Sequence, residues 1–142
     1  SGVIKTFIKR SDKNRQMMET HETKGKYAIT NYKTIKVFEN NKVPTLSFIE
    51  CKLETGRTHQ IRVHMNFKGN PILGDKSYGK MKKKFKKIDF NIEKKINSFN
   101  RQALHARSLG FIHPKSGKEI FFEAERPKDF NNLLKNLKKA SV

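Results

Sequence analysis

Cysteine and tryptophan are nearly absent from this chain of 142 residues, which has one cysteine and no tryptophan. Because Cys51 is alone, an internal disulfide and a zinc site built from several cysteines are both excluded. The β-branched and aromatic content of residues 46–53 predicts a strand there, so we interpret Cys51 as a small core residue and not as a nucleophile. A reducing, cytoplasmic setting fits this cysteine usage.

Long apolar runs are also missing. No run approaches the about 20 apolar residues that a transmembrane helix needs, and no basic segment carries the broad apolar face of a surface-bound helix. The first residues carry no signal-peptide pattern. We therefore expect no membrane partner.

Acidic residues are few: 13 Asp and Glu stand against 32 Lys and Arg, so the formal net charge is +19 and the pI about 10.2. Solubility alone requires far less charge. A compositional bias toward lysine would explain many lysines, but it would not explain why acids are so scarce. The sequence therefore favours a polyanionic partner, and nucleic acid above all.

The length and the hydrophobic content of 35% predict one domain over residues 1–142. Strand composition and alternation predict extended segments at residues 3–9, 28–38, 45–53, 103–113 and 118–125. The second and third of these should form one hairpin, and the last two should form another around the turn at 114–117, with Ile120, Phe122 and Ala124 facing inward. Between Phe48 and Ile49 the apolar side changes phase, which indicates either a bulge or burial of both faces.

Three helices are expected. Residues 91–100 carry apolar residues at helical spacing, and a helix that begins at Pro127, a favoured first helical position, places Phe130, Leu133, Leu134 and Leu137 on one stripe. The third would begin at a Thr58 cap and end at Gly69, although the residues between them also alternate as in a strand. Hairpins together with helices predict an α+β fold, a mostly antiparallel or mixed sheet with flanking helices.

The richest stretch for chemistry is Thr55 to His64, which concentrates arginine, histidine, glutamine and threonine where a core segment would place apolar side chains. Arg57 and Arg62 are five residues apart and would diverge on a helix. One would then point outward to a phosphate and the other inward to an anion. The alternative, a solvated basic face, is equally compatible with the spacing.

A metal site is not expected. His59 and His64 are also five residues apart, so their side chains would lie about 140° apart around a helix and could not readily share one ion. Gly69 and Gly74 flank an apolar segment and not a strand-to-helix phosphate loop. These residues therefore predict neither a metal site nor a phosphate-binding loop.

Several ordered motifs resemble the RluA-type pseudouridine synthases, which isomerise uridine in RNA. The matching segments are Thr55 to His64, Gly69 to Asp75, Tyr78-Gly79, Leu104 to Ala106, His113-Pro114 and Phe122 to Pro127. Residues 26–32 are similar to the strand that precedes the central motif in that family. The resemblance implies isomerisation of uridine to pseudouridine in ribosomal RNA without a cofactor.

Specific roles follow from the resemblance. Arg62 matches the arginine that pairs with the family's catalytic aspartate, and Ile61 and Val63 would be neighbouring pocket walls. The residues matched to contacts with the RNA backbone, or suggested for them by charge, are Arg57, His59, Lys82, Lys83, Lys84, Lys86 and Lys87.

The family's His-Arg-Leu-Asp motif, which contains the catalytic aspartate, does not occur in this sequence. The chain therefore looks like the C-terminal portion of a catalytic domain, expected to bind RNA, to be inactive alone, and to need the N-terminal half or self-association to cover its sheet. Asp75 follows a glycine in a turn, where a carboxylate commonly accepts backbone N–H groups, so we do not expect it to be the nucleophile. The alternative is a small basic, ribosome-associated RNA-binding module without catalysis.

Overall fold

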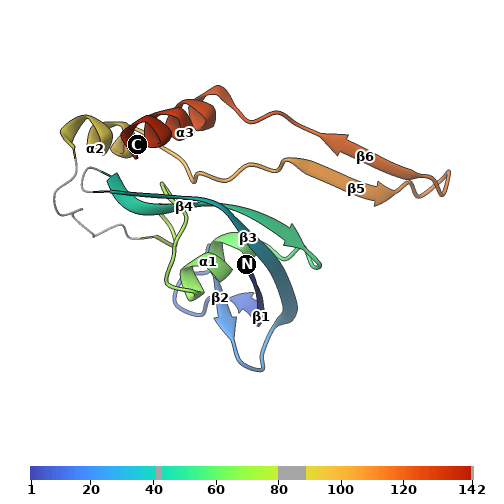
Figure 1. Ribbon diagram of the computed structural model, residues 1–142. Helices are drawn as coiled ribbons and strands as arrows, with labels where there is room; N and C mark the ends of the chain where they lie inside the picture. Colours follow the sequence, from blue (N-terminus) through green and yellow to red (C-terminus); the bar gives the residue numbers. More distant parts are fainter. Residues whose placement is uncertain (41–42, 80–88, 142) are drawn as a thin grey trace.

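The computed structural model describes residues 1–40, 43–79 and 89–141. Its elements are, in chain order, β1 Gly2–Arg10, β2 Met18–His21, β3 Lys26–Asn40, β4 Val43–Leu53, α1 Gln60–Phe67, α2 Phe90–Asn97, β5 Ser108–Ile112, β6 Glu119–Glu123 and α3 Lys128–Ala140. The expected α+β class is confirmed, since helices flank antiparallel sheets (Figure 1). In the described ranges, no helix is long and apolar enough to span a bilayer.

Four strands form the main sheet in the order β2-β1-β3-β4, and every neighbouring pair is antiparallel. The predicted hairpin of residues 28–38 and 45–53 is confirmed as β3 and β4. Strand β2 was not predicted, because its four residues, Met18–His21, show no apolar alternation. It forms by pairing with the end of β1, so it is a product of the tertiary structure.

The predicted irregularity near Phe48 and Ile49 is a β-bulge, and its extra residue lies in the partner strand. Thr34 pairs with Ile49 and Lys36 pairs with Phe48, which leaves Ile35 of β3 without a partner. A bulge disrupts the ladder locally and bends the strand that carries the extra residue. Phe48 packs against the apolar core, while Ile35 remains 50% exposed.

Helix α1 packs against one face of the sheet through polar as well as apolar side chains. His64 is fully buried, and its ring nitrogens lie 2.9 Å from the Thr6 hydroxyl and 2.8 Å from the Thr30 hydroxyl. Ile4 of β1 and Val63 of the helix are also buried. The two threonines come from adjacent strands, β1 and β3, so α1 is fixed across both.

An apolar cluster joins the far end of the β3–β4 hairpin to α2 and α3. Its buried members are Phe38, Ile92, Ile96, Phe130, Leu133, Leu134 and Leu137. The stripe predicted for the C-terminal helix is therefore confirmed, although Pro127 is its N-cap and the helix itself begins at Lys128, one residue later than predicted. Helix α2 begins at Asp89, whose carboxylate accepts hydrogen bonds from the N–H groups of Asn91 and Ile92.

The second predicted hairpin is confirmed as β5 and β6, but its predicted inward face is wrong. Phe122 is 57% exposed, Ala124 is exposed, and only Ile120 is half-buried. Figure 1 shows the hairpin projecting away from the main sheet. Alternation in a sequence indicates which side chains share a face, but it does not indicate whether another element covers that face.

Candidate functional site

Gln60, the first residue of α1, fastens the preceding loop to β3. Its side-chain oxygen accepts hydrogen bonds from the Thr55 hydroxyl, at 2.8 Å, and from the Arg57 N–H, at 2.9 Å. Its amide nitrogen donates to the carbonyl oxygen of Ile29, at 3.0 Å, and to the Thr30 hydroxyl, at 2.9 Å. All four hydrogen-bonding positions of this buried amide are used, so the position of the loop is firmly specified.

The helix starts one residue later than predicted. Its N-cap is His59 and not Thr58, and His59 adopts the left-handed conformation, with φ 55°. A non-glycine residue in this region indicates strain that the surrounding structure maintains. The predicted end is confirmed: Gly69 has φ 80°, and the N–H of Asn70 bonds to the Met65 carbonyl oxygen, as in a Schellman motif.

Arg62 points inward and pairs with Asp75. Its Nε lies 2.7 Å from Oδ2 and its Nη2 lies 3.0 Å from Oδ1, a bidentate arrangement. The Arg62 side chain is 14% exposed and the Asp75 side chain 1%. The pairing partner that the resemblance implied for Arg62 was an aspartate outside this chain, whereas the structure places one edge of the guanidinium on a carboxylate within it.

The backbone of the turn that follows Asp75 also binds its carboxylate. Its Oδ1 accepts hydrogen bonds from the backbone N–H groups of Ser77, at 3.0 Å, and Tyr78, at 3.1 Å, which confirms the expectation that this carboxylate serves a turn. Burial pushes the pKa of Asp75 upward, but the bonds from Arg62 and from the two N–H groups together outweigh burial and lower that pKa. The bond to Asp75 in turn raises the pKa of Arg62. Both side chains are therefore charged.

Tyr78 links this ion pair to His59 and to β2. The Arg62 guanidinium lies 4.8 Å from the centroid of the Tyr78 ring. The Tyr78 hydroxyl accepts the Met18 N–H at 2.8 Å and lies 2.7 Å from Nδ1 of His59. Burial, together with the positive charges of Arg62 and Arg10, lowers the pKa of His59 despite the opposing charge of Asp75. A lowered pKa favours neutral His59, whose Nδ1 can accept a hydrogen bond from the Tyr78 hydroxyl in the tautomer that carries its hydrogen on Nε2.

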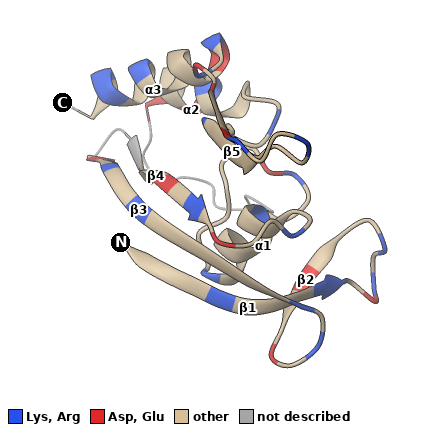
Figure 2. Ribbon diagram, turned by 90° about the vertical axis from the view of Figure 1, so that its right-hand side faces the viewer, with Lys and Arg blue, Asp and Glu red and all other residues tan. Residues whose placement is uncertain are grey.

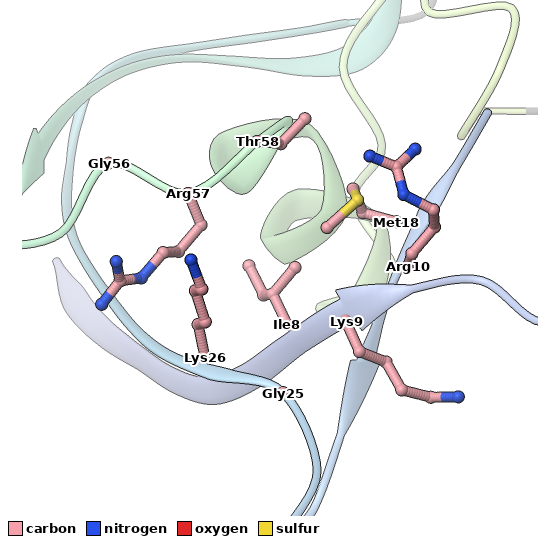
Figure 3. Close-up of a pocket in the computed structure, with 9 residues that line it drawn as sticks. All are labelled: Ile8, Lys9, Arg10, Met18, Gly25, Lys26, Gly56, Arg57 and Thr58. Carbon is pink, nitrogen blue, oxygen red and sulfur yellow. The ribbon is translucent and has the colours of Figure 1, made fainter. Parts of the chain in front are cut away.

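A hollow of about 380 Å³ opens beside this cluster, between β1, the start of β3 and the loop before α1 (Figure 3). We call it the basic hollow; the lining residues that matter below are Ile8, Arg10, Met18, Lys26, Arg57 and Thr58. A second hollow, of about 220 Å³, is lined in part by Met18, Val63 and Tyr78. The two hollows meet at Met18.

The structure brings some of the predicted site residues together and separates others. Arg57 and Arg62 diverge as expected, since Arg62 faces Asp75 while Arg57 lines the basic hollow. Val63 lines the second hollow, but Ile61 is half-buried and lines neither of the two. The predicted RNA-contacting lysines, Lys82, Lys83, Lys84, Lys86 and Lys87, lie outside the described residues.

Sequence reasoning gave no role to Tyr78, Arg10 or Lys26. Tyr78 belonged to a recognised motif, but its hydrogen-bond partners are distant in the sequence: Met18 lies 60 positions before it and His59 lies 19 positions before it. Lys and Arg residues are spread over the sheet and α3 (Figure 2), so composition could not single out Arg10 or Lys26. Within the described ranges, no three His, Cys, Asp or Glu side chains gather into a possible metal site.

Comparison with known proteins identifies the family. Residues 1–67 match the family model described as RNA pseudouridylate synthase. The ribosomal large subunit pseudouridine synthase D of Zymomonas mobilis is 45% identical over 137 residues, which cover 96% of this chain and 40% of that protein. An uncharacterised RNA pseudouridine synthase of Bacillus subtilis is 42% identical over 138 residues, covering 97% of this chain and 39% of that protein.

A solved structure, human RNA pseudouridylate synthase domain containing 1, shares this fold. The match covers 96% of this chain and 59% of the human chain, with a TM-score of 0.64 and 21% identity. Fold, motifs and relatives together define the class: this chain belongs to the RNA pseudouridine synthase family. It spans about 40% of the length of the two relatives named above.

Proposed function

We propose that this chain supplies the arginine side of the active site of a synthase that isomerises uridine to pseudouridine in ribosomal RNA. Two lines support the proposal: the family to which the chain belongs, and the printed names of relatives such as the Zymomonas protein. One structural observation carries it further. Arg62 is held in a fixed orientation, with one edge of its guanidinium bound and the other edge available.

The available edge of Arg62 is suited to a second carboxylate. A guanidinium has five N–H groups, and Asp75 engages only Nε and Nη2. Among the described residues, Nη1 has no hydrogen-bond partner. An aspartate bound there would be kept ionised and aimed by a charge-assisted pair, as a nucleophile that attacks the uridine nucleotide requires.

Asp75 is poorly placed to be that nucleophile. Both of its oxygens accept hydrogen bonds from Arg62, Ser77 or Tyr78, and only 1% of its side chain is exposed. A carboxylate that attacks a nucleotide must approach it closely. Asp75 is therefore a positioning residue, and the catalytic carboxylate comes from another segment of the synthase.

A chimera tests this proposal. This chain would replace the matching segment of the Zymomonas synthase, and pseudouridine would be measured by mass spectrometry of nucleosides from an unmodified ribosomal RNA transcript. We expect the chimera to form pseudouridine and Arg62→Ala to lower kcat by about 100-fold or more, since transition-state interactions of this kind are worth that much. Arg62→Lys should not restore the rate, because an ammonium group cannot bind two carboxylates in a fixed geometry.

Two controls complete the design. Arg107→Ala removes an arginine that is 68% exposed and forms an ion pair with the exposed Glu50, so activity should be retained. This chain alone should give no product, and turnover by it would refute the assignment of the carboxylate to another segment. A chimera that binds RNA with unchanged activity in Arg62→Ala would instead favour the alternative, a basic RNA-binding module without a catalytic role for this site.

A further inference from the structure

We propose that the basic hollow is a binding site for one phosphodiester group of the RNA strand, with Arg10, Lys26 and Arg57 as its charged residues. The inference rests on the proposed function, since it takes RNA as the ligand. It goes beyond that function by naming a subsite that includes Arg10 and Lys26, two residues for which the sequence predicted no role.

The positive charges of the basic hollow are held in place without being neutralised. Arg57 donates from Nε to the Tyr27 carbonyl oxygen at 2.9 Å, and Arg10 donates from Nη1 to the Arg15 carbonyl oxygen at 2.6 Å. A carbonyl oxygen orients a guanidinium but carries no net charge. In the described part of the chain, neither arginine forms an ion pair with a carboxylate, and the same is true of Lys26.

Lys9 provides the contrast within the same hollow. It lines the hollow but its ammonium group points away from the other cations (Figure 3). It pairs with Asp12 and Glu19, and the hydrogen bonds that it donates to these two carboxylates raise the pKa of Lys9. Carboxylates thus neutralise Lys9, whose ammonium group points out of the hollow, but not the three cations that remain in it. The uncompensated positive charge makes the hollow suitable for an anion.

The position of the basic hollow suits the phosphate of a nucleotide bound near Arg62. Met18 lines the hollow, and its backbone N–H bonds to the Tyr78 hydroxyl, whose ring lies under the Arg62 guanidinium. Thr58, which also lines the hollow, directly precedes His59. A strand whose phosphate lies here can therefore reach the Arg62 site, and loss of the phosphate contact should weaken RNA binding more than it slows the chemical step.

Gly56 offers a test that removes no existing contact. It lines the hollow, its φ lies outside the left-handed region, and a Cβ added there would meet no atom within 4 Å. Gly56→Asp therefore adds a negative charge without a clash, and Gly56→Asn adds a neutral side chain of the same shape. Measured by fluorescence anisotropy with a single-stranded RNA oligonucleotide and this chain, Gly56→Asp should bind about 10-fold more weakly than Gly56→Asn.

Salt dependence provides the second measurement. Lys26→Gln should lower the slope of log K against log salt by about 0.7, the value for one contact with a single-stranded phosphate. Lys135→Gln, an exposed lysine of α3, should leave the slope unchanged. Equal slopes for the two variants, or equal affinities for Gly56→Asp and Gly56→Asn, would overturn the inference and show that the charge acts only as a diffuse field.

Two further experiments are needed. The first distinguishes RNA from free phosphate as the ligand of the hollow, and the second distinguishes failure of this inference from failure of the proposed function. Inorganic phosphate should displace the RNA no better than chloride of the same ionic strength; stronger displacement would assign the hollow to free phosphate and contradict the RNA subsite. In the chimera, Gly56→Asp should raise KM for RNA about 10-fold relative to Gly56→Asn with kcat within about twofold. An inactive parent chimera would count against the proposed function, whereas an active one with unchanged KM would count against the hollow alone.

Discussion

Two regions of this chain hold a helix against the sheet in different ways. Around α1 the largest fully buried side chains are polar: Gln60, His64 and Thr30 are nearly or completely inaccessible, and each is hydrogen-bonded. Under α2 and α3 the contacts are apolar and centre on Phe38 and Leu133.

The difference matches what each region has to provide. A hydrogen bond has a preferred direction, so a buried network that is fully satisfied specifies one orientation of α1 and of the arginines beside it. Apolar burial is non-directional and roughly proportional to area, so the cluster under α3 contributes stability with less demand on geometry. The candidate site accordingly lies at the polar end.

The largest loss of stability should follow from a cavity in the apolar cluster. Leu133 is 6% exposed, so Leu133→Ala should lower the free energy of unfolding by about 2–5 kcal/mol. Urea denaturation followed by circular dichroism would measure it. Lys135→Ala, on the exposed side of the same helix, should change stability by less than about 0.5 kcal/mol. Similar effects of the two substitutions would contradict the assignment of this cluster as the core.

A smaller loss, but one with a functional consequence, is expected from the polar network. Gln60→Ala removes four hydrogen bonds and leaves the partly buried Arg57 N–H without its acceptor, so it should cost about 2–3 kcal/mol. It should also weaken RNA binding, because the loop that carries Arg57 is released. Gln16→Ala, at an exposed position, serves as the control. Lost stability with full RNA affinity would show that the network does not position Arg57.

Acid should weaken the polar region before the apolar one. Burial lowers the pKa of His64 below its ordinary value of 6.5, so the folded chain binds this proton less readily than the unfolded chain does. The stability contributed by neutral His64 is therefore present above pH 6.5 and is lost as the pH falls below it. When the pH is lowered from above 6.5 to below it, the free energy of unfolding should therefore decline less in His64→Gln than in the native sequence.

His59 must be separated from that effect, since its pKa is also lowered and its contribution has the same sign. His59→Asn removes the titration while keeping a residue that tolerates the left-handed conformation. The decline should persist in His59→Asn. An equal decline in His64→Gln would show that another group is responsible.

The smallest effect is expected in the hairpin of β5 and β6, where apolar side chains have no such packing. Phe122 is 57% exposed, so Phe122→Ser should change the unfolding free energy by less than about 1 kcal/mol. Sedimentation of the native chain should be measured alongside. A loss as large as that of Leu133→Ala, together with a concentration-dependent mass, would show that a second copy covers this face in solution.

Much of the local structure was predictable because its causes are local. The stripe of α3 and the turn at Gly69 follow from residues within a few positions of one another, and both are confirmed. The N-cap was missed by one residue because Gln60, bonded to Ile29 and Thr30 of β3, determines how the loop enters the helix. The inward face at Phe122 was wrong because nothing in a strand's own pattern reveals its cover.

By itself, the amino-acid sequence determined the family, the elements other than β2 and the basic character of the chain, and it singled out Arg62 as a candidate site residue. Only the tertiary structure decided which carboxylate holds Arg62, which tyrosine it stacks on, and that Arg10 and Lys26 share a hollow with Arg57. Spacing along a chain specifies periodicity over one or two helical turns. The direction of an ion pair and the walls of a hollow depend on strands brought together from distant positions, and they exist only after folding.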